Sequence, residues 1–95
     1  MIFEWFRSKA ESNLEKHGVS FGEAKTAFSD EMQFHYPDHA HSIEEQRFIC
    51  LGMSDQQRLL LIVYTEEVTD KIRIISAREA TQREEKIYAG QSDYS

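Results

Sequence analysis

A run of five apolar residues, 59–63, constrains the fold more than any other feature of the sequence. A strand with apolar side chains at every position is buried on both faces, so this run predicts a central strand, which we extend to residues 59–65. Residues 47–53 are predicted to form the neighbouring strand, because only a polar turn at residues 54–57 separates the two. An antiparallel hairpin is therefore expected in the middle of a sheet.

Three further strands are predicted around this hairpin. Apolar and polar residues alternate over residues 32–36, which is typical of a strand with one wet face. The apolar positions are Met32, Phe34 and Tyr36, and the polar positions are Gln33 and His35. Residues 72–75 are expected to close the sheet, and residues 2–5 to form an edge strand, because β-branched and aromatic side chains favour extended backbone.

Three helices are predicted from capping boxes, in which a Ser or Thr side chain and a Glu three residues later satisfy backbone N–H groups of the first turn. The pairs are Ser8 with Glu11, Ser20 with Glu23, and Thr81 with Glu84. The first helix is expected to end at Gly18, the second at about Phe28, and the third to cover residues 82–89. Their inward faces are expected to carry Ala10, Leu14 and His17, then Phe21, Ala24 and Phe28, then Ile87 and Tyr88.

The order of elements predicts an α+β domain, with two N-terminal helices and a C-terminal helix gathered on one face of a curled antiparallel sheet. Ser76 with Glu79 would also cap the last helix, but a start at Thr81 is preferred because it leaves residues 72–77 extended. We assign residues 1–90 to a single domain and residues 91–95 to a frayed tail. The opposite face of the sheet is expected to be free for a substrate or a partner.

Cysteine usage indicates a reducing compartment, and we expect the cytoplasm. The single Cys50 cannot form an internal disulfide, and it lies in an apolar run, as a small buried residue does. No stretch approaches the roughly 18 apolar residues that span a membrane, and residues 1–6 lack the apolar core of a signal peptide. No cofactor is expected.

Net charge restricts how this chain can bind nucleic acid. With 11 Lys and Arg against 17 Asp and Glu the net charge is −6, so the surface as a whole repels phosphates. Residues 71–88 differ, because five cations there accompany three anions. The cations are Lys71, Arg73, Arg78, Arg83 and Lys86. A small basic site on an acidic body is therefore predicted.

Several blocks of residues match a known family over nearly the whole chain. The two strictest are residues 16–21, Lys-His-Gly-Val-Ser-Phe, and residues 72–78, Ile-Arg-Ile-Ile-Ser-Ala-Arg. Further matches lie at Phe3, Glu4, Trp5, Lys9, Ala10, Asn13, Glu23, Ala24, His41, Ser42, Glu44, Glu45, Arg47, Ala80, Thr81, Glu84 and Tyr88. With these residues the sequence resembles the BrnT family of bacterial toxins.

The resemblance implies a RelE-like fold and a ribonuclease activity that stops translation. It also implies a cognate antitoxin, BrnA-like and DNA-binding, that neutralises the toxin and represses their shared promoter. We therefore expect a hetero-oligomer, in which a basic antitoxin segment is steered to the acidic body and covers the arginine site. A different class of function stays open, namely a catalytically silent subunit that binds the antitoxin and acts as a co-repressor.

Metal-free RNA cleavage needs a base, an acid and cations, because the attacking group is the substrate's own 2′-hydroxyl. Arg73 and Arg78 are predicted to converge on a single phosphodiester at the end of the last strand, since the guanidinium fork matches phosphate. The structural alternative for Arg73 is an ion pair, for example with Glu45. His41 is the predicted proton-transfer residue, because a histidine titrates at about pH 6.5.

A second set of side chains is predicted to contact RNA, namely Lys16, His17, Arg47, Arg58, Arg83 and Tyr88. Structural roles compete with these assignments: cations stabilise helix ends, charges occupy strand edges, and a Tyr packs with its hydroxyl at the rim. Three histidines in the segment 35–41 suggest a metal site. Two of them lie in a loop without a Cys partner, so a solvated loop is preferred and no metal is predicted.

Overall fold

The computed structural model describes residues 1–41 and 45–90. The elements are β1 (Ile2–Glu4), α1 (Arg7–His17), α2 (Phe21–Ala27), β2 (Phe34–Pro37), η1 (His39–His41), β3 (Phe48–Met53), β4 (Leu59–Val68), β5 (Lys71–Glu79) and α3 (Gln82–Gly90). Helices packed with one sheet confirm the α+β class. Ser42 and Glu44 of the family blocks and the predicted tail 91–95 lie outside the described residues. Within the two described ranges, no helix is long and apolar enough to cross a membrane.

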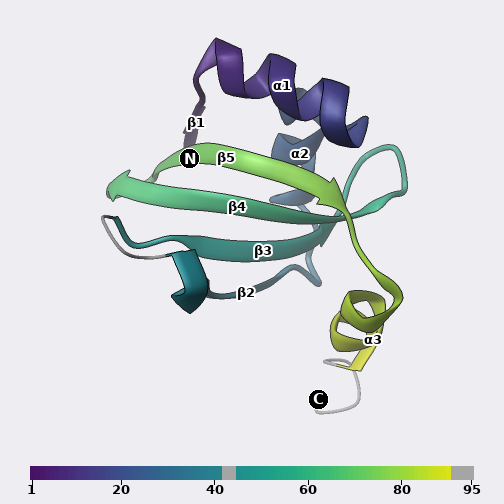
Figure 1. The fold of residues 1–95 in the computed structure, drawn as a ribbon. Helices are drawn as coiled ribbons and strands as arrows, with labels where there is room; N and C mark the ends of the chain where they lie inside the picture. Colours follow the sequence, from purple (N-terminus) through teal and green to yellow (C-terminus); the bar gives the residue numbers. More distant parts are fainter. Residues whose placement is uncertain (42–44, 91–95) are drawn as a thin grey trace.

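The sheet has five strands in the order β1-β5-β4-β3-β2 (Figure 1). The predicted central strand and hairpin are confirmed, because β4 lies in the middle and pairs antiparallel with β3, with Cys50 opposite Ile62. β1 is an edge strand, as predicted, but it pairs in parallel with β5. The sheet is therefore mixed rather than wholly antiparallel, and β5 is an inner strand rather than the one that closes the sheet.

The main hydrophobic core lies between the sheet and the helices α1 and α2; Figure 1 shows α2 behind the strands. Its buried side chains are Val19, Phe21, Ala24, Ala27, Phe28, Cys50, Leu60, Ile62, Tyr64, Ile72, Ile74 and Ala77. At Gly52 the helix comes so close that an added Cβ would lie 2.6 Å from the Ala27 carbonyl oxygen, so glycine is required there. Burial raises the pKa of Cys50 to about 12, which keeps the thiol protonated and unreactive.

The boxes predicted for α2 and α3 cap their helices. At the start of α2, Ser20 Oγ accepts a hydrogen bond from the backbone N–H of Glu23 (3.0 Å). At α3 both bonds of the box form: Thr81 Oγ1 accepts from the Glu84 N–H (3.2 Å), and Glu84 Oε1 accepts from the Thr81 N–H (2.9 Å). The box predicted at Ser8 is wrong, because α1 begins before this residue and has no side-chain cap.

The inward face of α1 also differs from the prediction. Its buried residue is Asn13, whose side-chain amide donates to the carbonyl oxygens of Val19 (2.9 Å) and Ala77 (2.8 Å). These bonds hold α1 against β5 and fix the rotation of the helix about its own axis. In that rotation Leu14 is 52% exposed and His17 is exposed, so neither belongs to the core.

The second face of the sheet also carries buried side chains, which corrects the expectation that all helices share one face. Leu51 and Leu61 are buried but lie outside the main core. Leu61 pairs across the strands with Arg78, whose guanidinium binds Glu84 of α3. α3 therefore lies over one end of the second face (Figure 1). Ile87, predicted to point inward, is exposed.

β2 alternates as predicted, with half-buried Phe34 and Tyr36 and an exposed His35. His35 is exposed but lies on the side of the sheet that packs against α2: its Nδ1 lies 2.7 Å from the Tyr64 hydroxyl oxygen, and its ring centroid lies 5.9 Å from that of Phe28. Burial lowers the pKa of His35, which favours its neutral form. Phe34 and Tyr36 lie on the second face instead. The alternation did not say which side of the sheet carries the helices, because this sheet packs side chains on both faces.

Candidate functional site

A row of half-buried side chains crosses the second face of the sheet, with one residue from each of four adjacent strands. We call this row the open face; it consists of Tyr36, Ile49, Val63 and Ser76. Figure 1 looks onto this side of the sheet, with η1 and α3 on either side of it. Apolar surface beside hydroxyl groups suits a nucleobase that stacks and a phosphate that accepts hydrogen bonds.

Arg78 lies beside the open face and is held by α3. Its Nη1 and Nη2 donate to Glu84 Oε1 (2.8 Å) and Oε2 (2.9 Å), and Nη1 also donates to the Glu79 carbonyl oxygen (3.2 Å). Hydrogen bonding to Arg78 is the main cause that lowers the pKa of Glu84, and the same bond raises the pKa of Arg78. The side chain of Arg78 remains 38% exposed, so the oriented guanidinium is still accessible to an anion.

Tyr36 connects the charged groups around the open face. Burial raises the pKa of its hydroxyl, and the charges of Glu84, Arg78 and Asp38 act on the same group. All three charges therefore lie near the Tyr36 hydroxyl, which keeps its proton and can donate a hydrogen bond. The residue was missed in the sequence because its alternation pattern assigned it to the core. A tyrosine at such a position is amphipathic, and this was the available signal.

His41 forms a pair with Asp38 next to the open face. The imidazole Nδ1 lies 3.1 Å from Asp38 Oδ2, and Asp38 is buried while the His41 side chain is 69% exposed. A carboxylate on one ring nitrogen fixes the tautomer and leaves the other nitrogen for proton transfer. The predicted proton-transfer residue therefore has the orienting partner that this role needs.

Arg73 lies at the other end of β5, so the predicted convergence of Arg73 and Arg78 on one phosphodiester is wrong. Both side chains are on the second face, but they are five positions apart along the strand, which separates them by roughly 15 Å. Arg73 donates to Glu45 (2.7 Å) and lies 2.7 Å from Glu67, and its side chain is only 19% exposed. The ring of Phe6 covers its guanidinium at 5.3 Å. The ion-pair alternative for Arg73 is the one that the structure contains.

The second set of predicted RNA contacts does not gather around the open face. Arg47 lies with Arg73, since both bind Glu45. Arg58 forms two hydrogen bonds to the buried carboxylate of Glu23 and donates to the Gly18 carbonyl oxygen (3.1 Å). These bonds give Arg58 a structural role.

The second set of predicted RNA contacts also includes Tyr88, Lys16, His17 and Arg83. The Tyr88 hydroxyl donates to Asp30 Oδ2, and burial together with this bond raises its pKa to about 12. This bond ties α3 to the segment after α2. Lys16 and His17 are exposed in the last turn of α1, and Arg83 is exposed on α3. Contacts of these residues with RNA stay predictions.

The histidines of segment 35–41 do not share one site, because His35 turns toward Tyr64 whereas His41 binds Asp38. Across residues 1–41 and 45–90, no three His, Cys, Asp or Glu side chains are grouped as a metal site requires.

Comparison with known proteins gives a family and a fold. The family model described as the ribonuclease toxin BrnT of type II toxin–antitoxin systems matches residues 5–84. The crystal structure of the Brucella abortus ribonuclease toxin BrnT superposes with a TM-score of 0.66 at 20% sequence identity, covering 86% of this chain and 100% of that one. At this identity the second match supports the fold. No curated protein sequence gives a significant match.

Proposed function

The chain belongs to the BrnT family of ribonuclease toxins from type II toxin–antitoxin systems, and we propose that it cleaves RNA on the open face, through Arg78, His41 and Tyr36. One observation carries this assignment. Tyr36 lies in the same cross-strand row as Ser76, which is two residues from Arg78 on the same face of β5, and Asp38, two residues after Tyr36, holds His41 at 3.1 Å. A cation, a neutral hydroxyl donor and an oriented imidazole thus lie beside one stretch of sheet.

These groups support cleavage without a metal ion. The 2′-hydroxyl attacks phosphorus, the bond from phosphorus to the 5′-oxygen breaks, and a 2′,3′-cyclic phosphate forms. His41 accepts the proton of the 2′-hydroxyl, and the leaving 5′-oxygen takes a proton from water. Arg78 binds the phosphoryl oxygens, on which negative charge increases in the transition state. Glu84 keeps the guanidinium in place, so little reorganisation is needed during the reaction. Tyr36 donates to the phosphate or packs against a base.

A type II toxin implies a cognate antitoxin. We propose a BrnA-like, DNA-binding partner that forms a hetero-oligomer with the toxin in the cytoplasm, where RNA cleavage would stop translation. That an antitoxin segment covers Arg78 remains a prediction. The catalytically silent subunit considered from the sequence is not carried further, because the family is one of ribonucleases.

Inducing the chain alone in a bacterium tests the proposed function. We expect growth arrest and shortened transcripts, because no antitoxin is present to neutralise the toxin. Transcript integrity on gels and the 5′ ends of the fragments are measured over time after induction. Unhindered growth with intact transcripts, despite soluble protein, would contradict the proposal.

The two histidines of η1 provide a matched test of proton transfer. His41→Ala should lower the initial rate of RNA cleavage by about 100-fold or more, since general acid–base catalysis contributes on this scale. His39→Ala should leave the rate nearly unchanged, because His39 is exposed in the same turn. Rates are measured on a labelled RNA with purified proteins. Equal losses in both variants would show that η1 acts only as a structural turn.

A further inference from the structure

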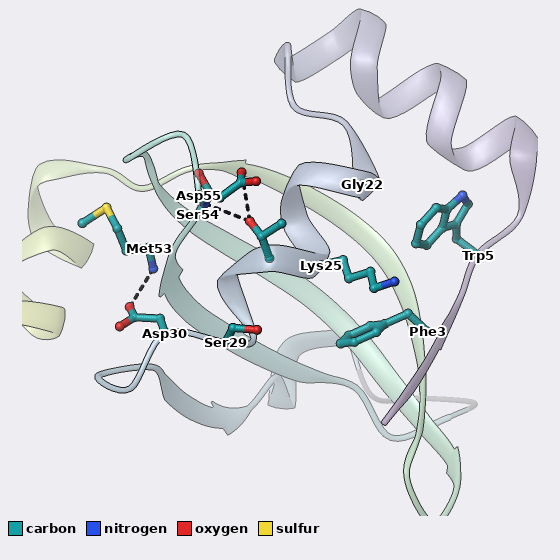
Figure 2. A pocket seen from close by; sticks show the side chains of 10 residues that line it. Phe3, Trp5, Gly22, Lys25, Ser29, Asp30, Met53, Ser54 and Asp55 are labelled. Atoms are coloured by element: carbon teal, nitrogen blue, oxygen red, sulfur yellow. Dashed lines mark hydrogen bonds between the residues drawn. The ribbon is translucent and has the colours of Figure 1, made fainter.

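An open groove crosses the outer side of α2, away from the open face. It has a volume of about 850 Å³, and Figure 2 shows Trp5 and Phe3 at one end and Met53 and Asp30 at the other. A smaller hollow of about 220 Å³ shares Trp5 and Gly22 with it and continues to Leu14 on α1. Together they form one surface, which we call the helix-side groove.

Large apolar side chains are accessible along this groove. Trp5 is 37% exposed although its ring packs edge-on against Phe21 in the core. Leu14 and Met53 are exposed at opposite ends. Aligned, accessible apolar groups in a hollow are typical of a surface that another protein covers. Such a surface is most readily filled by a segment with apolar side chains along one side.

Gly22 gives an independent reason to expect a second chain. Glycine destabilises a helix relative to alanine, so a helical glycine calls for an explanation. Gly52 is needed for close packing, and Gly18 has a φ of +68° at the end of α1, where glycine was predicted. Gly22 has neither reason: an added Cβ would meet only the Ser20 Oγ, at 3.9 Å. Its missing side chain leaves the groove open at this point, which allows another backbone to approach closely.

The charges of the groove indicate the chemistry of the partner. Glu11, Asp30 and Asp55 line it with a single cation, Lys25, whose ammonium lies over the Phe3 ring. The whole chain carries a net charge of −6. A second copy of this chain would bring the same negative charge to the contact. A basic segment would be attracted and steered to the groove.

We propose that the helix-side groove binds a basic, amphipathic segment of the cognate antitoxin. The proposal rests on the family assignment for the existence of that partner, and it places this contact away from the RNA site. Apolar side chains of the segment contact Trp5, Leu14 and Met53, and its cations lie near Asp30 and Asp55. The backbone of the segment passes over Gly22.

Filling the groove at Gly22 tests this proposal. Gly22→Gln should weaken binding to the purified cognate antitoxin by about thirtyfold, the scale of a central interface residue, and Gly22→Ala should weaken it less. Gly90→Gln is the matched control, because Gly90 also lies in a helix with open space around its Cα but does not line the groove. Affinities are measured by titration calorimetry, and RNA cleavage without antitoxin should be unchanged in Gly22→Gln.

The only tryptophan provides a second measurement on the unmodified chain. Binding should shift the emission of Trp5 to shorter wavelength, after subtraction of the antitoxin's own emission. Wild-type affinity in Gly22→Gln, or an unchanged Trp5 emission, would overturn the proposal. So would a self-association of the toxin alone that Gly22→Gln abolishes, since the occupant would then be a second copy. Because affinity is measured without RNA, a failed nuclease assignment gives a different result from a failed docking site.

Discussion

Arg78→Ala is expected to lower the rate of RNA cleavage by about 100- to 1,000-fold, the usual loss when one preoriented donor to a developing anion is removed. Arg78 lies beside Tyr36 and is held by both oxygens of Glu84. Its guanidinium therefore has a fixed position before substrate arrives. The loss should appear in kcat rather than only in KM, because charge on the phosphate increases in the transition state.

Arg73→Ala is the control within the same strand. Arg73 is held by Glu45 and Glu67 at the other end of β5, so its removal should change the cleavage rate by less than about tenfold. Circular dichroism and thermal unfolding of both variants show whether the fold is intact. Continued growth arrest by Arg78→Ala, or equal losses of rate in both variants, would disprove the assignment of the site to the Arg78 end.

Arg58→Met is expected to lower the free energy of unfolding by about 3 kcal/mol, because it leaves a buried carboxylate without its cation. Glu23 is buried and receives hydrogen bonds from Arg58 and from Ser54 Oγ (2.7 Å). Removing one partner of a buried ion pair usually costs more, but Arg58 is itself partly exposed and Ser54 continues to donate to Glu23. Urea unfolding measures the change. A domain of this size is marginally stable, so the effect is large.

Neutralising the second partner is the control for this variant. The double variant Glu23→Gln, Arg58→Met should be more stable than Arg58→Met alone, because no unpaired charge stays buried and the side-chain amide oxygen introduced at position 23 can still accept from Ser54. If the double variant is no more stable, the loss comes from packing of the Arg58 side chain rather than from the charge of Glu23.

The same ion pair predicts how stability depends on pH. Hydrogen bonding to Arg58 is the main cause that lowers the pKa of Glu23 below its ordinary value of 4.5. The pair therefore contributes fully above pH 4.5, and its contribution is lost as the pH falls through the lower pKa of the folded state. In Arg58→Met, protonation of the buried Glu23 carboxyl removes an unpaired charge and therefore stabilises the folded state. The difference in unfolding free energy between the two proteins should shrink below pH 4.5, as urea titrations at several pH values would show.

Several parts of the fold could be predicted because they depend on neighbouring residues. The apolar run from Leu59 requires burial on both faces, and β4 is the central strand. Ser20 and Thr81 cap their helices through bonds that span three residues. His41 was named as the proton-transfer candidate from its residue type and from the family block that it begins, whereas its contact with Asp38 appears only in the structure.

Other parts depended on groups that are distant in the sequence. The rotation of α1 is set by bonds from Asn13 to Ala77, and His35 bonds the Tyr64 hydroxyl from a distant strand. No periodic pattern contains such contacts. The open face was expected in outline, but α3 was placed on the wrong side of the sheet, and Tyr36 was missed with it.

The sequence by itself determined the strands, two of the three helix caps, the acidic charge and the family, because each depends on residues that are close together in the sequence. Only the tertiary structure decided which cations can act together. Arg73 and Arg78 are both on one face of β5, yet the length of an extended strand separates them and carboxylates from other elements bind each one. The position of a side chain in a site depends on its contact partners from other elements. Those partners are fixed only when the sheet and its helices pack.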